Sequence, residues 1–260
     1  MEGLNALAGF GVGLLVGLTG VGGGSLMTPI LVLLFGHAPA VAVGTDLWFA
    51  ALTKSAGSVL HHGRGTVDWQ VLRRLWLGSL PAALLTLLWM HLSGFGRQGN
   101  GALVAIVGGV LLLTALAMLF KNRIHAVGQG LRTQTPDAFK RVQPALTVVA
   151  GAVLGVLVTL TSIGAGALGT VMLVYLYPRR LTSARLVGTD ILHAVPLTIL
   201  AGTGHLLLGN VDLPLLGSLL LGSIPGVLLG SHYSSRAPDG LLRPVIAGVL
   251  VLVAIKMLLG

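Results

Sequence analysis

The sequence contains no cysteine and few charged residues, and each absence excludes a class of protein. With no cysteine among 260 residues, disulfide bonds, thiol chemistry and thiolate metal sites are excluded. Only 9% of the residues are charged, 54% are hydrophobic, and the mean hydropathy is +0.93. Because soluble domains carry about 25% charged residues, the composition predicts an all-α polytopic membrane protein rather than a soluble domain.

Apolar runs of helix length recur along the chain, for example at 75–92, 102–120 and 244–259. The 39 glycines agree with this class, since small residues let membrane helices approach closely. The net charge of +9 is interpreted as a topology signal that also favours an anionic substrate or lipid headgroups. We expect membrane lipids as partners, no nucleic acid, no cofactor and no metal. With seven acidic residues, a cation carrier is disfavoured.

Two glycine-dense breaks interrupt apolar runs, one in each half of the chain. Residues 17–29 read GLTGVGGGSLMTP and residues 159–171 read TLTSIGAGALGTV. Glycine there frees backbone N–H groups in a region without water. A pair of such breaks is the sequence signature of a transporter with its substrate site near the bilayer midplane.

The two halves are copies of one unit. Residues 43–82 match residues 187–226 at fifteen of forty positions without a gap, at an offset of 144. The expected organisation is a first membrane repeat (1–120), a cytoplasmic linker (121–143) and a second membrane repeat (144–260). The linker is expected to be a surface loop, with or without a short interfacial helix. Each repeat has a broken first segment followed by three transmembrane helices.

The broken first segments, 4–35 and 145–177, decide the topology. If they cross the membrane, the repeats are parallel; if they re-enter as hairpins of two half-helices, the repeats are inverted. The inverted arrangement places thirteen Lys and Arg residues inside and two outside, whereas the parallel one gives nine and six. The positive-inside rule therefore favours inverted repeats with both termini outside the cytoplasm.

The breaks are the first candidates for a substrate site. A new half-helix is expected to start near Ser25, and its unpaired N–H groups carry the positive end of the helix dipole. Facing a cavity, two such ends suit a small oxyanion such as sulfite, sulfate or a sulfonate. The alternative is tight helix packing or a flexible kink. The predicted substrate-binding residues of the breaks are Gly22, Gly23, Gly24, Ser25, Ser162, Gly164 and Gly166.

The repeated Gly-Thr-Asp triplets place two carboxylates in apolar spans. Such a group is costly unless it is paired, protonated or hydrated, so Asp46 and Asp190 are candidate proton carriers. The alternative is that a helix restarts at the preceding glycine, Gly44 or Gly188, and that the aspartate stabilises its first turn. Thr45 and Thr189 either donate hydroxyl groups to the substrate or bond their own helix.

Lys54 and two histidines complete the candidate set. Lys54 lies near mid-span, where Thr198 is its repeat mate, and it either holds substrate charge or pairs with Asp46. His61 and His205 close the second span of each half; they either relay protons at opposite membrane faces or are ordinary interfacial residues. Asp68 and Asp212, in a Gly-x-Val-Asp turn, are expected to cap the next helix.

At these residues the chain resembles the TauE/SafE family of sulfite and organosulfur exporters over nearly its whole length. The motifs are Gly20-x-Gly22-Gly23-Gly24-x-Leu26-x-x-Pro29, Gly44-Thr45, His61-x-x-x-Gly65-x-Val67-Asp68 and Gly78-Ser79-x-Pro81. The family pattern usually has serine after Gly-Thr, where this chain has Asp46 and Asp190. The resemblance implies an inner-membrane carrier of sulfur-containing anions.

Together these observations predict a secondary transporter of the bacterial inner membrane, not an enzyme. It would export a small sulfur oxyanion or organosulfonate by alternating access of its two halves, with proton coupling through the aspartates. The alternatives are an anion-selective channel and a carrier of a different small organic anion. A homodimer is left open.

Overall fold

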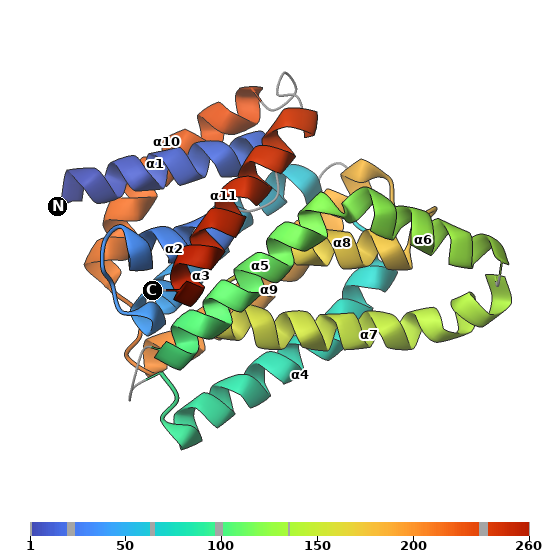
Figure 1. Ribbon diagram of the computed structural model, residues 1–260, viewed down its shortest axis with the longest axis horizontal. Helices are drawn as coiled ribbons and strands as arrows, with labels where there is room; N and C mark the ends of the chain where they lie inside the picture. The colour runs from blue at the N-terminus through green and yellow to red at the C-terminus, as the bar shows by residue number, and fades with distance from the viewer. Residues whose placement is uncertain are drawn as a thin grey trace.

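The computed structural model describes residues 2–19, 24–62, 66–96, 101–134, 136–233 and 239–259, and every regular element in these ranges is an α-helix (Figure 1). The predicted all-α architecture is confirmed. The helices are α1 (Glu2–Thr19), α2 (Gly24–Leu33), α3 (Pro39–His62), α4 (Trp69–Ser93), α5 (Gly101–Leu119), α6 (Lys121–Gln134), α7 (Pro136–Thr161), α8 (Ala167–Leu176), α9 (Ser183–Leu207), α10 (Leu213–Tyr233) and α11 (Asp239–Leu259).

Among the described residues, five helical stretches are long and apolar enough to cross a membrane. The outer surfaces of α4 and α10 carry exposed leucines, including Leu77, Leu85, Leu221 and Leu228. Such surfaces suit contact with lipid rather than water. The five stretches are Trp69–Ser93, Gly101–Leu119, Phe139–Thr161, Ser183–Leu207 and Leu213–Gly230, and three shorter apolar helices accompany them, Gly3–Leu18, Ala167–Leu176 and Pro244–Leu259.

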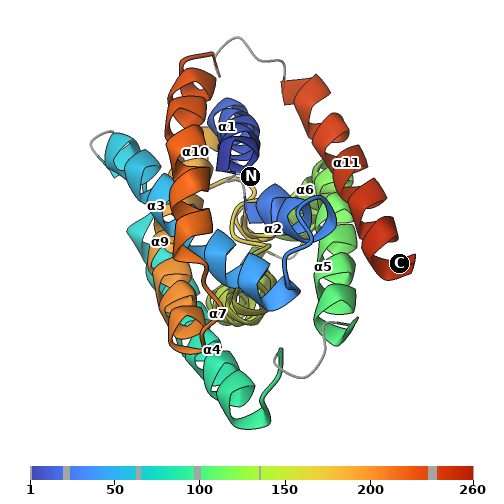
Figure 2. The same cartoon turned by 90° about the vertical axis from the view of Figure 1, so that its left-hand side faces the viewer.

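Helices α1–α5 and α7–α11 form two matching sets that pack reciprocally. Helix α1 lies along α10, and its counterpart α7 lies along α4, the counterpart of α10 (Figure 1). The equivalent helices α3 and α9 pack against each other, and so do α5 and α11 (Figure 2). These main helix contacts between the halves therefore recur with the halves exchanged, as expected for a duplicated unit.

Glycines allow the paired helices to touch backbone to backbone. A Cβ added to Gly78 of α4 would lie 1.9 Å from the Val148 carbonyl oxygen of α7. At the repeat-matched Gly222 of α10, it would lie 1.7 Å from the Ala6 carbonyl oxygen of α1. Both positions exclude every side chain, which is the close packing expected of small residues in membrane helices.

The equivalent helices α3 and α9 run in opposite directions. Gly44, near the start of α3, abuts Asn210 just beyond the end of α9, and Gly188, near the start of α9, abuts Thr66 just beyond the end of α3. An antiparallel pair of equivalent helices is what inverted repeats require. The inverted topology and the re-entrant first segments stay predictions, which this contact favours over parallel repeats.

Both broken segments consist of a longer helix followed by a ten-residue half-helix. Helix α1 ends at Thr19 before α2, and α7 ends at Thr161 before α8. Ten residues span about 15 Å, half of a hydrocarbon core of about 30 Å. The predicted linker, 121–143, contains α6 and the first turns of α7. Helix α6 packs against α8.

Candidate substrate site

The second glycine break is a buried turn with an unusual backbone. Ser162 has φ 59°, Gly164 has φ 120° and Gly166 has φ 126°. The last two values lie outside the region that L-residues readily adopt, which accounts for glycine at both positions. Gly166 is the N-cap residue of α8 and forms no side-chain hydrogen bond. The first amide groups of α8 are therefore not capped by the side chain of this residue.

The first break is described only on its C-terminal side. Helix α2 begins at Gly24, as the prediction of a new half-helix near Ser25 requires. Gly22 and Gly23 lie outside the described residues, as do the side chain of Ser25 and that of His61. Their predicted roles therefore stay predictions.

The expectation that a helix restarts at Gly44 or Gly188 is wrong. Helix α3 runs without interruption from Pro39 and α9 from Ser183, so both glycines lie within continuous helices. The packing of the helices explains why glycine occurs at these two positions, because each glycine makes room for the backbone of the other half. Asp46 and Asp190 consequently do not belong to a first turn of their own helices.

Each aspartate instead contacts the half-helix of its own repeat. Asp46 Oδ2 accepts hydrogen bonds from the Thr28 hydroxyl at 2.6 Å and from its backbone N–H at 3.2 Å, both in α2. The Asp190 carboxylate interacts with the backbone N–H of Gly166 at the start of α8. A Cβ on Gly169 would lie 2.3 Å from Asp190 Oδ1, so glycine there admits the carboxylate. The Asp190 carboxylate thus lies at the positive end of α8, and that of Asp46 lies beside the middle of α2.

Lys54 connects the two halves at this place. Its Nζ donates a hydrogen bond of 2.7 Å to the carbonyl oxygen of Ala165, in the break of the other half. The ammonium group also interacts electrostatically with Asp190 and Asp46. Within the part of the chain that the structure describes, Lys54 is the one buried lysine or arginine, 5% exposed. The predicted pairing with Asp46 is therefore one part of a three-residue charge cluster.

Several buried oxygen atoms of this cluster have no hydrogen-bond partner among the described residues. They are Asp46 Oδ1, Asp190 Oδ1 and Ser162 Oγ. The Ser162 side chain lies beside the Asp46 carboxylate. Buried polar atoms are rarely left unsatisfied in proteins, so this cluster has the capacity to take a proton, a water molecule or a polar ligand.

The two threonines of the Gly-Thr-Asp triplets bond across the halves. Thr189 Oγ1 accepts the backbone N–H of Asp68 at 2.9 Å, and Thr45 Oγ1 accepts that of Asp212 at 3.1 Å. Both threonine side chains are fully buried. The sequence predicted that these threonines donate to the substrate or bond their own helix. The structure shows instead that they bond the opposite half.

His205 is buried in contacts within the protein. Its Nε2 lies 2.9 Å from the carbonyl oxygen of Thr159, and its Nδ1 lies 3.5 Å from Asn210 Nδ2. Because a carbonyl only accepts, Nε2 carries the hydrogen. A second buried histidine, His193 of α9, forms a hydrogen bond of 2.9 Å between its Nε2 and the Ser79 hydroxyl of α4. A proton relay through His205 stays a prediction.

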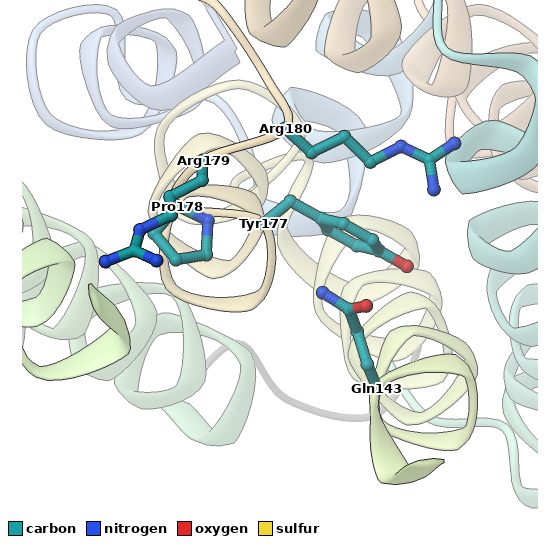
Figure 3. Close-up of a pocket in the computed structure, with 5 residues that line it drawn as sticks. All are labelled: Gln143, Tyr177, Pro178, Arg179 and Arg180. Carbon is teal, nitrogen blue, oxygen red and sulfur yellow. The ribbon is translucent and has the colours of Figure 1, made fainter. Parts of the chain in front are cut away.

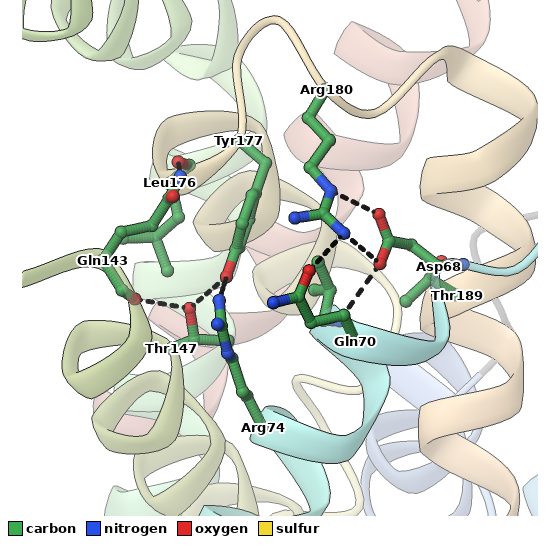
Figure 4. A network of polar contacts seen from close by, with 10 residues as sticks. Asp68, Gln70, Arg74, Gln143, Thr147, Leu176, Tyr177, Arg180 and Thr189 are labelled. Carbon is green, nitrogen blue, oxygen red and sulfur yellow. Dashed lines mark hydrogen bonds and ion pairs between the residues drawn. The ribbon is translucent and has the colours of Figure 1, made fainter. Parts of the chain in front are cut away.

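The helix-capping roles predicted for Asp68 and Asp212 are confirmed. Asp68 Oδ1 accepts the Val71 N–H at 3.2 Å, and Asp212 Oδ1 accepts the Leu215 N–H at 2.9 Å. Asp68 also forms an ion pair with Arg180, at the centre of a polar network between α4, α7 and the α8–α9 loop (Figure 4). No pattern in the sequence predicted this ion pair.

Comparisons with known proteins agree with this architecture. The chain matches the family described as "Sulfite exporter TauE/SafE" over residues 5–257. It is 39% identical over 254 residues to "Probable membrane transporter protein YjnA" of Bacillus subtilis (strain 168), covering 97% of this chain and 98% of the relative. It is 28% identical over 255 residues to YdhB, also a probable membrane transporter protein of that organism, covering 94% and 97%.

No solved structure gives a significant match. The family match extends over almost the whole chain, and the apolar helices supply its membrane spans. The chain is therefore a multi-pass membrane transporter that belongs to the TauE/SafE sulfite exporter family.

Proposed function

We propose that this transporter exports a small sulfur-containing anion, sulfite or an organosulfonate, from the bacterial cytoplasm by alternating access. The observation that supports this most is Lys54, a buried cation that extends from one half into the glycine break of the other. A buried charge in a membrane protein is expensive, and it is a functional hypothesis by default. The family description supplies the substrate class.

The anion would bind where Lys54, Ser162 and the starts of the two half-helices meet. An oxyanion accepts hydrogen bonds from an ammonium group more strongly than the neutral Ala165 carbonyl does, since charge-assisted bonds are about twice as strong. The Ser162 hydroxyl, which lies beside the Asp46 carboxylate, would supply a further donor by turning from that carboxylate to the anion. The other predicted contacts are the amides of Gly22, Gly23, Gly24, Ser25, Gly164 and Gly166.

Charge balance favours coupling to protons. The cluster holds one ammonium group and two carboxylates, so a bound anion adds negative charge to a site already rich in it. Uncompensated charge in the interior costs several kcal/mol per ion. Protonation of Asp46 or Asp190 would offset the charge of the cargo, so each anion would move together with a proton.

The reciprocal packing supports alternating access. The cluster lies where residues of both halves meet, and the contacts on its two sides are related by exchange of the halves. Rocking of one half against the other would open the cluster to each side in turn. Under this proposal the repeats are inverted, the linker is cytoplasmic and both termini are extracytoplasmic.

The test is transport of radiolabelled sulfite and taurine by the purified protein in proteoliposomes. The carrier proposal expects saturable flux and acceleration by unlabelled anion on the opposite side. Lys54→Gln should lower flux at least tenfold. Thr198→Val is the matched control, since Thr198 is the repeat mate of Lys54 and bonds only backbone of its own helix. Flux that does not saturate would indicate a channel, and transport of other organic anions alone would reject the substrate class.

A further inference from the structure

The ion pair between Asp68 and Arg180 joins the two halves at one end of the molecule. Arg180 Nε lies 2.6 Å from Asp68 Oδ2, and Arg180 Nη2 lies 2.8 Å from Asp68 Oδ1 (Figure 4). This is the bidentate geometry in which arginine binds carboxylates and other oxyanions. The Arg180 side chain is 41% exposed and that of Asp68 is 6% exposed, so a solute can approach the guanidinium group but not the carboxylate.

A cavity of about 160 Å³ lies beside this arginine. Its lining consists of Gln143, Tyr177, Pro178, Arg179 and Arg180 (Figure 3). The Arg180 guanidinium group lies over the Tyr177 ring at 5.8 Å. A second arginine reaches the same tyrosine, because Arg74 Nη1 donates to the Tyr177 hydroxyl at 3.2 Å. Two arginines, Arg179 and Arg180, thus line the cavity, and their positive charge suits a small anion.

The ion pair has no counterpart in the other repeat. Asp212 caps α10 as Asp68 caps α4, but the corresponding loop between α2 and α3, residues 34–38 with Gly36 at its centre, contains no arginine. Gly36 has φ 67°, and a Cβ there would contact nothing within 4 Å. Among the described residues Asp212 therefore has no arginine partner. The difference contrasts with the hydrogen bonds of Thr45 and Thr189 between the halves, which are reciprocal.

The ion pair is connected to the charge cluster through the backbone. The N–H of Asp68 is bonded to Thr189, which directly precedes Asp190. A movement of Asp68 away from Arg180 therefore acts on the segment of α9 that carries a carboxylate of the cluster.

We propose that Arg180 is the first binding site for the anion on the side of the membrane where the α8–α9 loop lies. Asp68 occupies this site until the anion displaces it. Displacement by an oxyanion exchanges one bidentate partner of the guanidinium group for another. It also breaks one of the contacts between the two halves. The inference rests on the proposed function, since the anion that displaces Asp68 is the cargo.

Sulfite transport by proteoliposomes tests this order of events. Arg180→Gln should raise the half-saturating sulfite concentration about tenfold. Asp68→Asn should lower it severalfold, since asparagine still caps α4 but releases the arginine. Asp212→Asn, the repeat-matched control, should leave it unchanged. If Arg180→Gln and Asp68→Asn shift it in the same direction, or if Asp212→Asn reproduces Asp68→Asn, the inference is wrong.

A second measurement does not depend on transport. Because the chain has no cysteine, Gln143→Cys introduces a single thiol into the cavity, and its reaction with a charged maleimide can be followed in the purified protein. Sulfate should slow the reaction more than chloride at equal ionic strength. Arg180→Gln should abolish this protection and Asp68→Asn should strengthen it.

The two measurements separate the two proposals. If the native protein does not transport sulfite but sulfate still protects the thiol through Arg180, the anion site stands and the proposed function fails. If sulfite is transported but sulfate protects no better than chloride, the inference about Arg180 is overturned while the proposed function stands.

Discussion

Thr189 in α9 accepts a hydrogen bond from the backbone N–H of Asp68, which belongs to the opposite half of the chain. The repeat-matched pair, Thr45 and Asp212, makes the same contact on the other side. Each threonine directly precedes an aspartate of the charge cluster. Two equivalent hydrogen bonds thus fix the halves to each other next to both carboxylates, and their strength bears on how easily the halves move.

Thr189→Val should destabilise the protein by about 1–3 kcal/mol, since it leaves the buried N–H of Asp68 without an acceptor. Thr45→Val should cost less, because Asp212 is only partly buried. Thermal unfolding in detergent measures both. Thr203→Val in the same helix is the control: Thr203 is exposed and bonds only its own helix, so its effect should stay within about 0.5 kcal/mol. Equal effects of Thr189→Val and Thr203→Val would contradict the structural role.

The helices of this fold could be predicted from the sequence because their signals are local. The apolar runs 75–92 and 102–120 correspond to α4 (Trp69–Ser93) and α5 (Gly101–Leu119). Apolar runs bounded by glycine, proline and charged residues set these limits. The internal repeat likewise predicted that α4 and α10 have equivalent caps, which Asp68 and Asp212 provide.

The contacts of the site could not be predicted in the same way. Lys54 and Ala165 are 111 residues apart, and no periodicity links a lysine to a carbonyl group in another segment. The internal repeat pairs Thr28 with Thr170, which is a weak signal that Thr28 belongs to the site. The two threonines nevertheless differ in the structure, since Thr28 bonds Asp46 and Thr170 bonds the Gly166 carbonyl before its own helix. Arg180 had no repeat signal, because the matching loop of the first repeat, residues 34–38, contains no arginine.

Gly222→Ala should destabilise the protein by about 1–3 kcal/mol or prevent folding, because the added methyl group would overlap the Ala6 carbonyl of α1. Gly217→Ala in the same helix is the matched control. A Cβ there contacts nothing within 4 Å, so alanine should be neutral or stabilise by up to about 1 kcal/mol through helix propensity. The melting temperatures of the two variants in detergent provide the comparison. Similar values would show that α1 and α10 are not packed this closely.

Ser162→Gly should separate stability from transport. Ser162 has φ 59°, a conformation that costs a non-glycine residue about 1–2 kcal/mol. Glycine should therefore raise the melting temperature, whereas sulfite affinity should fall about fivefold with the loss of one hydrogen bond. Ser162→Ala removes the hydroxyl but keeps the strain, so it should lower affinity equally without stabilising the protein. An unchanged affinity in both variants would remove Ser162 from the site.

Lys54→Met should destabilise the protein by about 3–5 kcal/mol, because it leaves Asp190 and Asp46 buried without their cation. Asp190→Asn removes one of these charges, so the double variant should be more stable than the sum of the single effects predicts. The expected coupling is at least about 1 kcal/mol, measured as a double-mutant cycle of thermal unfolding. The corresponding cycle with Asp46→Asn should show weaker coupling, since Asp190 is the stronger electrostatic partner of Lys54. Strict additivity in both cycles would mean that the ammonium group and the carboxylates do not act as one cluster, and the charge-balance argument for proton coupling would then lose its basis.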